Sequence, residues 1–121
     1  MNKTLCLPLR KEWYNMIEKG IKTEEYRLTS RHWIVRLLEK TDGTRITSSE
    51  AFEYEFCPGK IAKMIISEKW RPKIYDYVKF SYGYTSRTMS FAYSGLDIAK
   101  GNTEWGAPNE VVFIIKLRRL C

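Results

Sequence analysis

The stretch from Gly20 to Arg27 reads Gly-Ile-Lys-Thr-Glu-Glu-Tyr-Arg and gathers charged and aromatic residues directly after a predicted helix. If this stretch is extended, successive side chains point to opposite faces. One face then holds Lys22, Glu24 and Tyr26, and the other holds Thr23, Glu25 and Arg27. Glu25 can fix the guanidinium of Arg27 while other N–H donors stay available to a polar ligand. The alternative is a solvated edge strand whose surface ion pair contributes little stability.

The composition indicates one domain spanning residues 1–121. A chain of 121 residues can bury a hydrophobic core without a metal or disulfides. Its three cysteines, Cys6, Cys57 and Cys121, are odd in number and form no Cys-x-x-Cys pair. This pattern argues against a disulfide framework and against a zinc site, and we expect no cofactor. The sequence has neither a signal-peptide core nor an apolar run of membrane length, so we expect a cytoplasmic protein without a membrane partner.

The charge balance favours a polyanionic partner. Lys and Arg total 21 against 14 Asp and Glu, which gives a formal charge of +7, and 14% of the residues are aromatic. Cations interleaved with aromatic side chains suit binding to phosphates and stacking on unpaired bases. Basic charge also occurs in proteins that are merely soluble, and most aromatic residues of a small domain lie in its core. Charge therefore indicates nucleic acid as a class of partner without selecting a site.

The N-terminal residues predict a strand, a helix and a second strand. In Thr4–Leu9 the leucines alternate, which indicates a strand that ends near Pro8. From Arg10 to Lys19 the apolar residues Trp13, Met16 and Ile17 have helical spacing, and Gly20 ends the helix. The second strand is expected over Lys22–Leu28.

The middle of the chain predicts one helix followed by an irregular insertion. Ser30 can cap a helix that runs to Lys40, whose apolar face contains Trp33 and Leu37. Turn-forming residues flank an acidic and aromatic segment between Thr41 and Gly59. We interpret residues 41–59 as an insertion that contains a short helix and packs its aromatic residues on the body or caps a cleft.

The second half of the sequence predicts mostly β-structure. The apolar run Ile61–Ser67, the alternating Tyr77–Tyr82 and the segment Ser90–Ile98 are expected strands, with a bulge or bend at Gly95. An ordered loop follows, and the last strand, Val111–Leu117, is apolar on both faces and belongs in the middle of a sheet. The expected fold class is α+β, a small β-barrel with two or three helices packed at its N-terminal side.

Together, the first strand, the helix and the charged stretch resemble an ASCH domain, a member of the PUA-like β-barrel superfamily. The resemblance rests on the alternation of Leu5–Leu9 and on Trp13 and Ile17 in the helix. It also rests on four residues that match the family signature Gly-x-Lys-x-x-Glu-x-Arg, namely Gly20, Lys22, Glu25 and Arg27. The β-rich second half fits the barrel of that family, whereas we place no family counterpart for residues 41–59.

The resemblance implies a cleft beside the first helix, lined by the signature residues, with RNA, a nucleotide or a modified nucleoside as ligand. Some relatives hydrolyse acetylated cytidine with the motif lysine, a threonine three residues later and a glutamate elsewhere. Others have been described as ribonucleases. In this chain the residue three positions after Lys22 is Glu25, and Thr23 follows Lys22 directly, so the chain departs from the amidohydrolase pattern.

Three functions follow from these residues. The first is an RNA-binding or nucleotide-binding module in which Lys22 and Arg27 donate to phosphate and Glu25 orients them. The second is a small hydrolase, a ribonuclease or a modified-nucleoside amidohydrolase, with Lys22 and Glu25 as catalytic residues. The third is a protein-interaction domain that uses residues 41–59.

Further ligand-binding candidates combine aromatic faces, hydroxyls and cations. Besides Thr23 they are Tyr82, Tyr84, Arg87 and Trp105, with Arg71 as an additional cation. A loop with these residue types can clamp an unpaired nucleotide. Trp13 and Trp33 are expected in the core. His32, as the sole histidine, is expected on the surface and cannot build a metal site by itself.

Overall fold

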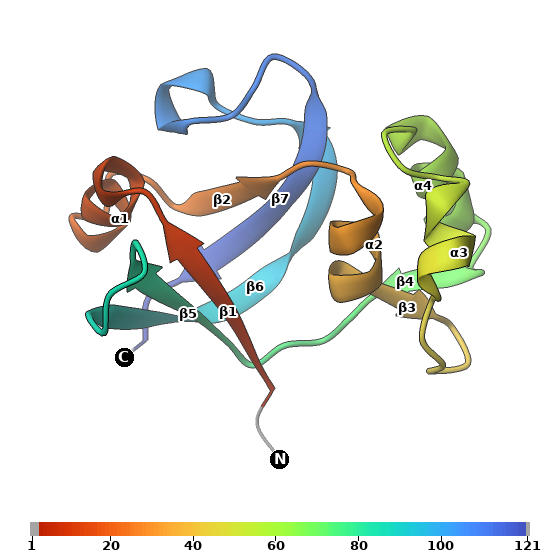
Figure 1. Cartoon of the computed structure of the whole chain (residues 1–121), viewed down its shortest axis with the longest axis horizontal. Coiled ribbons are helices and arrows are strands. Elements are labelled where there is room, and N and C mark those ends of the chain that lie inside the picture. The colour runs from red at the N-terminus through yellow and green to blue at the C-terminus, as the bar shows by residue number, and fades with distance from the viewer. Residues whose placement is uncertain (1–2, 121) are drawn as a thin grey trace.

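The computed structural model describes residues 3–120, which form seven strands and four α-helices (Figure 1). The strands are β1 (Thr4–Leu9), β2 (Glu24–Arg27), β3 (Leu38–Lys40), β4 (Trp70–Pro72), β5 (Tyr77–Tyr82), β6 (Thr88–Lys100) and β7 (Val111–Arg118). The helices are α1 (Lys11–Glu18), α2 (Arg31–Leu37), α3 (Ser48–Phe52) and α4 (Pro58–Ile66), and Thr103–Trp105 form one turn of 3-10 helix.

Five strands form one curled sheet in the order β1-β5-β6-β7-β2. The pair β1 and β5 is parallel, and the other neighbours are antiparallel. Strands β3 and β4 form a separate two-stranded sheet. In Figure 1 the five strands wrap into a half-barrel, with α1 at one end and α2, α3 and α4 at the other. The α+β class and the barrel-like curl expected from the sequence are confirmed.

The first strand has the predicted bounds, and its alternation explains its position. Leu5, Leu7 and Leu9 are buried, whereas the residues between them are exposed. Pro8 lacks an amide hydrogen, which is tolerated because β1 lies at the edge of the sheet. The carbonyl of Pro8 accepts a hydrogen bond from Arg27 of β2, the strand at the other edge of the sheet.

The closing strand β7 lies between β6 and β2, as its apolar sequence predicts. Its residues Val112 to Ile115 are all buried. The predicted irregularity at Gly95 is also confirmed, because the β6–β7 register shifts between Tyr93 and Gly95, where φ is 135°. The bulge increases the local twist that curls the sheet.

Two expectations about helices are corrected. The helix after Ser30 ends at Leu37, and Leu38–Lys40 continue as β3 instead of extending the helix to Lys40. Ser30 occupies the N-cap position without a side-chain capping hydrogen bond. The described residues also contain four helices instead of two or three.

The run Ile61–Ser67, predicted as a strand, is helical up to Ile66 and belongs to α4, with Ser67 as the C-cap. Pro58 stands in the first helical turn, where its missing N–H costs nothing. Ile61, Met64 and Ile65 have helical spacing and face the hydrophobic core. Residues 41–59 contain the predicted short helix, α3, which begins with a capping box formed by Thr47 and Glu50.

The main hydrophobic core lies between the sheet and helices α1, α2 and α4, and a small second cluster surrounds Tyr26 and Val112. Within residues 3–120, no helix is long and apolar enough to cross a membrane.

Candidate functional site

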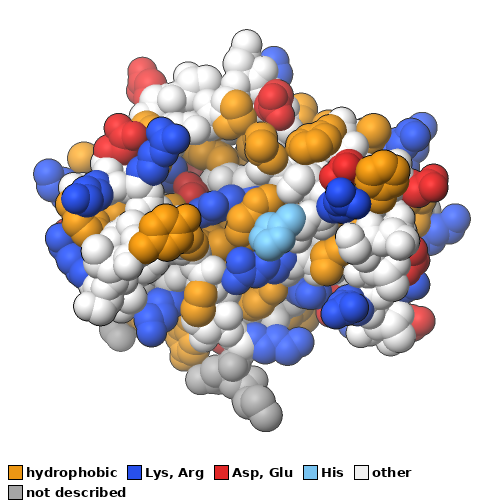
Figure 2. Space-filling model, in the orientation of Figure 1, with side chains coloured by type: hydrophobic (Ala, Val, Ile, Leu, Met, Phe, Trp, Pro, Cys, Tyr) orange, Lys and Arg blue, Asp and Glu red, His pale blue; other side chains and the backbone are white. Residues whose placement is uncertain are grey.

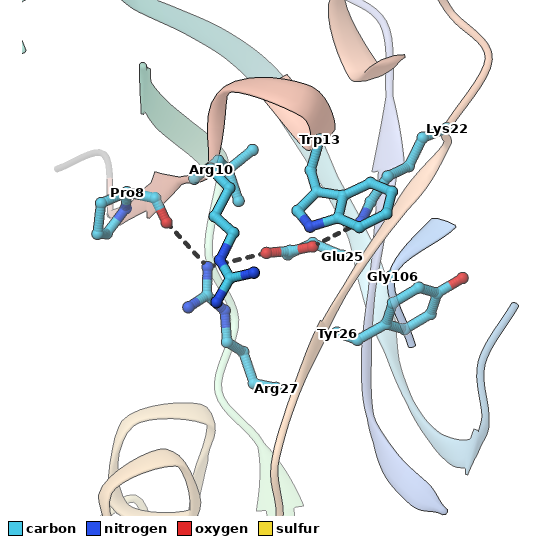
Figure 3. Close-up of a pocket in the computed structure, with 9 residues that line it drawn as sticks. Pro8, Arg10, Trp13, Lys22, Glu25, Tyr26, Arg27 and Gly106 are labelled. Atoms are coloured by element: carbon cyan, nitrogen blue, oxygen red, sulfur yellow. Dashed lines mark hydrogen bonds and ion pairs between the residues drawn. The ribbon is translucent and has the colours of Figure 1, made fainter. Parts of the chain in front are cut away.

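A pocket of about 370 Å³ opens where the end of β1, the start of α1 and the strand β2 meet. Its walls come from segments far apart in the sequence. They are Pro8, Leu9, Arg10, Trp13, Lys22, Glu25, Tyr26, Arg27 and Gly106. Three residues of the signature, Lys22, Glu25 and Arg27, therefore line one pocket, and Figure 3 shows the carboxylate of Glu25 between the other two side chains.

The Lys22 side chain can reach Glu25 because Lys22 lies before the start of β2. The predicted strand Lys22–Leu28 is shorter in the structure, where β2 covers Glu24–Arg27, so alternation does not govern Lys22. Gly20 turns the chain with φ 78°, and the amides of Ile21 and Lys22 both donate to the Met16 carbonyl. This tight turn brings the Lys22 side chain to the same face as Glu25 and Arg27. Alternation alone would place Lys22 on the opposite face.

The Lys22 ammonium is buried and has several partners. Its Nζ lies 2.9 Å from Oε1 of Glu25 and donates to the carbonyl of Trp105. It also lies 5.0 Å from the ring centroids of both Trp13 and Tyr26. Such cation–π contacts are strongest where water is excluded. Lys22 therefore holds the pocket together and offers little free donor capacity.

Arg27 binds the second carboxylate oxygen of Glu25. Its Nη2 lies 2.9 Å from Oε2 of Glu25 and 3.2 Å from the Pro8 carbonyl oxygen. The guanidinium carbon lies 4.9 Å from the Trp33 ring centroid. The Arg27 Nε is buried and lacks a hydrogen-bond partner among the described residues. Glu25 thus has one cation on each oxygen, and Arg27 retains an unused donor.

The pocket has an excess of positive charge. Arg10, Lys22 and Arg27 line it together with one carboxylate, that of Glu25. Arg10 is exposed, and Figure 3 draws its side chain among the residues that line the pocket. Since both oxygens of Glu25 are already bound to cations, Arg10 has no carboxylate partner within the pocket. The arrangement favours an anionic ligand.

Tyr26 supplies an aromatic wall and stays uncharged at neutral pH. Burial raises the pKa of its phenol, as does the nearby Glu24 carboxylate, although the hydrogen bond from the Asn102 amide to its oxygen opposes these effects. Its ring packs with Ala107 and Val112. The pocket therefore has a fixed, neutral aromatic surface beside its cations.

Several pocket residues are not identified by the sequence pattern. Pro8, Arg10, Tyr26 and Gly106 join the site only through tertiary contacts. Trp13 and Trp33, both expected in the core, are half-buried, and Trp13 stands on the pocket wall. The sequence could have indicated some of them by their proximity, since Arg10 directly follows β1 and Trp13 lies about one helical turn later.

The other sequence candidates lie outside this pocket. Tyr82 stacks edge-on against Tyr14 at 5.2 Å, and Arg87 lies over both rings and pairs with Glu18 at 3.0 Å. The Tyr84 side chain is 97% exposed on the hairpin between β5 and β6.

Three further candidates have structural partners. Trp105 contributes its carbonyl to Lys22, and the exposed Thr23 accepts the Leu117 amide with its carbonyl. Arg71 pairs with Glu39 at 2.8 Å. His32 is exposed, as expected.

In the part of the chain that the structure describes, no three His, Cys, Asp or Glu side chains gather as a metal site. Comparison with protein-family models, with curated proteins and with solved structures finds no match to this chain.

Proposed function

We propose that this protein is an RNA-binding or nucleotide-binding module of the ASCH type, within the PUA-like superfamily, whose ligand enters the Lys22–Glu25–Arg27 pocket. The observation that carries the proposal is the charge arrangement of this pocket. Arg10, Lys22 and Arg27 surround a single carboxylate that is already paired on both oxygens. A phosphate suits the free donors of the exposed Arg10 together with the positive charge of Lys22 and Arg27.

The pocket is preorganised for binding. Lys22 and Glu25 are 2% and 6% exposed, so the ligand does not have to order them. Trp13 and Tyr26 supply flat apolar surfaces next to the cations, as expected for a site that accommodates a base beside its phosphate. Preorganised side chains reduce the entropy lost on binding.

Binding is better supported than hydrolysis by the same geometry. A general base needs a free lone pair directed at the proton that it removes. The two Glu25 oxygens instead accept from Lys22 and Arg27, each at 2.9 Å. Lys22 likewise directs its ammonium at Glu25 and the Trp105 carbonyl.

The test is fluorescence anisotropy of a labelled single-stranded RNA over a range of salt concentrations. Arg10→Ala is the cleanest variant, because Arg10 is exposed and forms no ion pair in the described residues. We expect Arg10→Ala to weaken binding several-fold. The slope of the logarithm of the binding constant against the logarithm of the salt concentration, the salt slope, should fall in magnitude by about 1.4 in Arg10→Ala with Arg27→Ala, about 0.7 for each lost phosphate contact.

The matched control is Lys60→Ala with Lys63→Ala, which removes the same charge from exposed positions of α4, outside the pocket. We expect this control to keep most of the RNA affinity and most of the salt slope of the wild-type protein. The proposed function is wrong if RNA does not bind, or if the two double variants lose RNA affinity equally.

A further inference from the structure

A second basic pocket has a volume of about 330 Å³ and shares no lining residue with the first pocket. It is formed by the residue before β1, the turn after β3 and the segment between β4 and β5. Its lining consists of three cations, one carboxylate, a glycine and a tyrosine, namely Lys3, Arg45, Lys73, Glu39, Gly43 and Tyr75.

The positive charge of this pocket is not balanced by the described residues. The Glu39 carboxylate accepts from Nε of Arg71 at 2.8 Å. The nearby Asp76 carboxylate accepts the backbone amide of Lys3, also at 2.8 Å. Among residues 3–120, no carboxylate lies within 4.0 Å of the Lys3, Arg45 or Lys73 side-chain nitrogens.

Lys73 shows what this imbalance costs the folded protein. Burial lowers the pKa of its ammonium; Glu39 opposes the shift, whereas Lys3, Arg45 and Arg36 add to it by charge repulsion. A half-buried lysine among like charges is unfavourable without an anion. An anionic ligand that entered here would relieve this repulsion.

Arg36 and Trp33 connect the two pockets. The Trp33 ring lies 4.9 Å from the guanidinium carbon of Arg27 and 5.4 Å from that of Arg36. Arg36 is held in place by its donation to the Cys6 carbonyl at 3.0 Å. Its own carbonyl accepts from the hydroxyl of Tyr75, which lines the second pocket.

The contacts that link the two pockets are therefore basic and aromatic. Lys and Arg side chains recur across the middle and the lower part of the face shown in Figure 2, interrupted by hydrophobic side chains. Alternating cations and aromatic rings are the features by which proteins follow a single strand, with phosphates on the cations and bases on the rings.

We propose that Lys3, Arg45 and Lys73 form a second anion site, which binds a backbone phosphate of the same nucleic-acid strand that occupies the first pocket. This inference rests on the proposed function. The strand runs from Arg10 and Arg27 across Trp33 and Arg36 to the second pocket. The ligand is thus a single-stranded oligonucleotide, and a mononucleotide fills only part of the site.

The experiment compares a dinucleotide with an oligonucleotide of about ten residues, within the usual site size of such domains. The test variant is Arg45→Ala with Lys73→Met, because Arg45 is exposed and methionine keeps the apolar stem of Lys73. The control is Lys60→Ala with Lys63→Ala, which changes the net charge equally and lies outside both pockets. Thermal unfolding of each variant checks the fold.

We expect the longer RNA to bind the wild-type protein at least tenfold more tightly than the dinucleotide. The test variant should lose roughly tenfold in affinity for the longer RNA and about 1.4 in its salt slope. Its affinity for the dinucleotide should stay unchanged, and the control should change neither.

The inference is overturned if Arg45→Ala with Lys73→Met binds the longer RNA as the control does, while Arg10→Ala still weakens both ligands. That result would leave the first pocket as a nucleotide site. Absence of binding at every length would instead contradict the proposed function and this inference together.

Discussion

Lys22 and Glu25 form an ion pair of 2.9 Å whose side chains are 1% and 8% exposed. The pair joins the turn after α1 to the edge strand β2, and Arg27 extends it to the carbonyl of Pro8 at the end of β1. One carboxylate thereby ties three segments around the pocket. Loss of Glu25 leaves the buried Lys22 ammonium without a carboxylate, which is far more costly than loss of a surface pair.

We predict that Glu25→Gln destabilises the fold more than Lys22→Met does. Glu25→Gln leaves the buried Lys22 ammonium beside Arg27 without a carboxylate, for which about 3–5 kcal/mol is expected. In Lys22→Met, Glu25 keeps Arg27 as its partner, so the loss should be smaller. Urea unfolding monitored by circular dichroism measures both free energies.

The double variant Lys22→Met with Glu25→Gln provides the coupling energy of the pair. The double variant removes both charges of the pair and leaves only Arg27 without a carboxylate, and Arg27 is more exposed and keeps the Pro8 carbonyl as a partner. We therefore expect the double variant to be more stable than the sum of the single losses indicates. Simple additivity would show that the pair does not interact as the structure describes.

Gly106 is predicted to be required for the shape of the pocket. Its φ is 95°, and a Cβ at this position would lie 2.7 Å from Cε2 of Trp13. Gly106→Ala should therefore displace the Trp13 ring, destabilise the fold by about 1–3 kcal/mol and weaken RNA binding.

Gly83→Ala is the control for this prediction. Gly83 also has a positive φ, 60°, but a Cβ there meets nothing within 4 Å. It should cost only the backbone strain, roughly 1 kcal/mol, and leave binding intact. Equal binding losses in the two variants would disprove a specific role for Gly106.

Lys73→Met should stabilise the protein near neutral pH, in a pH-dependent way. Burial lowers the pKa of Lys73 from 10.5 in the folded protein. Between the lowered value and about 10.5 the unfolded chain binds more protons than the folded one, so the lysine's contribution to stability rises with pH.

Below the lowered pKa, Lys73 is protonated in both the folded and the unfolded protein, and the full free-energy penalty of its buried charge remains. The stability gain of Lys73→Met should therefore be largest near neutral pH and shrink as the pH approaches 10.5. Chemical unfolding of both proteins across this range measures the difference. A difference independent of pH would show that Lys73 carries no such penalty.

We predict no turnover of single-stranded RNA or of acetylated nucleosides. Each oxygen of Glu25 accepts from a cation, Lys22 or Arg27, so the carboxylate is placed to orient these two side chains and not to take a proton from a ligand. Chromatography of the nucleotides after prolonged incubation tests this directly. Product formation that is lost in Glu25→Gln, with the fold intact, would instead support the hydrolase alternative.

Local periodicity predicted those features that depend on neighbouring residues. The alternation of Leu5, Leu7 and Leu9 defined β1, and the spacing of Glu25 and Arg27 placed both on one face of β2. The apolar sequence of β7 predicted its central position. Each of these features follows from the two-residue period of a strand.

Features set by tertiary contacts were not predictable in this way. The position of Lys22 depends on the turn at Gly20 and on the start of β2 at Glu24. Trp13 stands on the pocket wall because the distant Gly106 approaches its ring. The run Ile61–Ser67 is short and apolar, and such a run suits a buried strand and a helix equally well.

The most direct test of the account is amide chemical-shift mapping of the isotope-labelled protein during titration with a single-stranded RNA of about ten nucleotides. We predict that the largest shifts fall on the pocket residues Arg10, Trp13, Glu25, Arg27 and Gly106, and that Arg27→Ala reduces the shifts at equal RNA concentration. Shifts that leave these amides unchanged and gather on the Tyr82–Arg87 hairpin would contradict it, as would the absence of any shift.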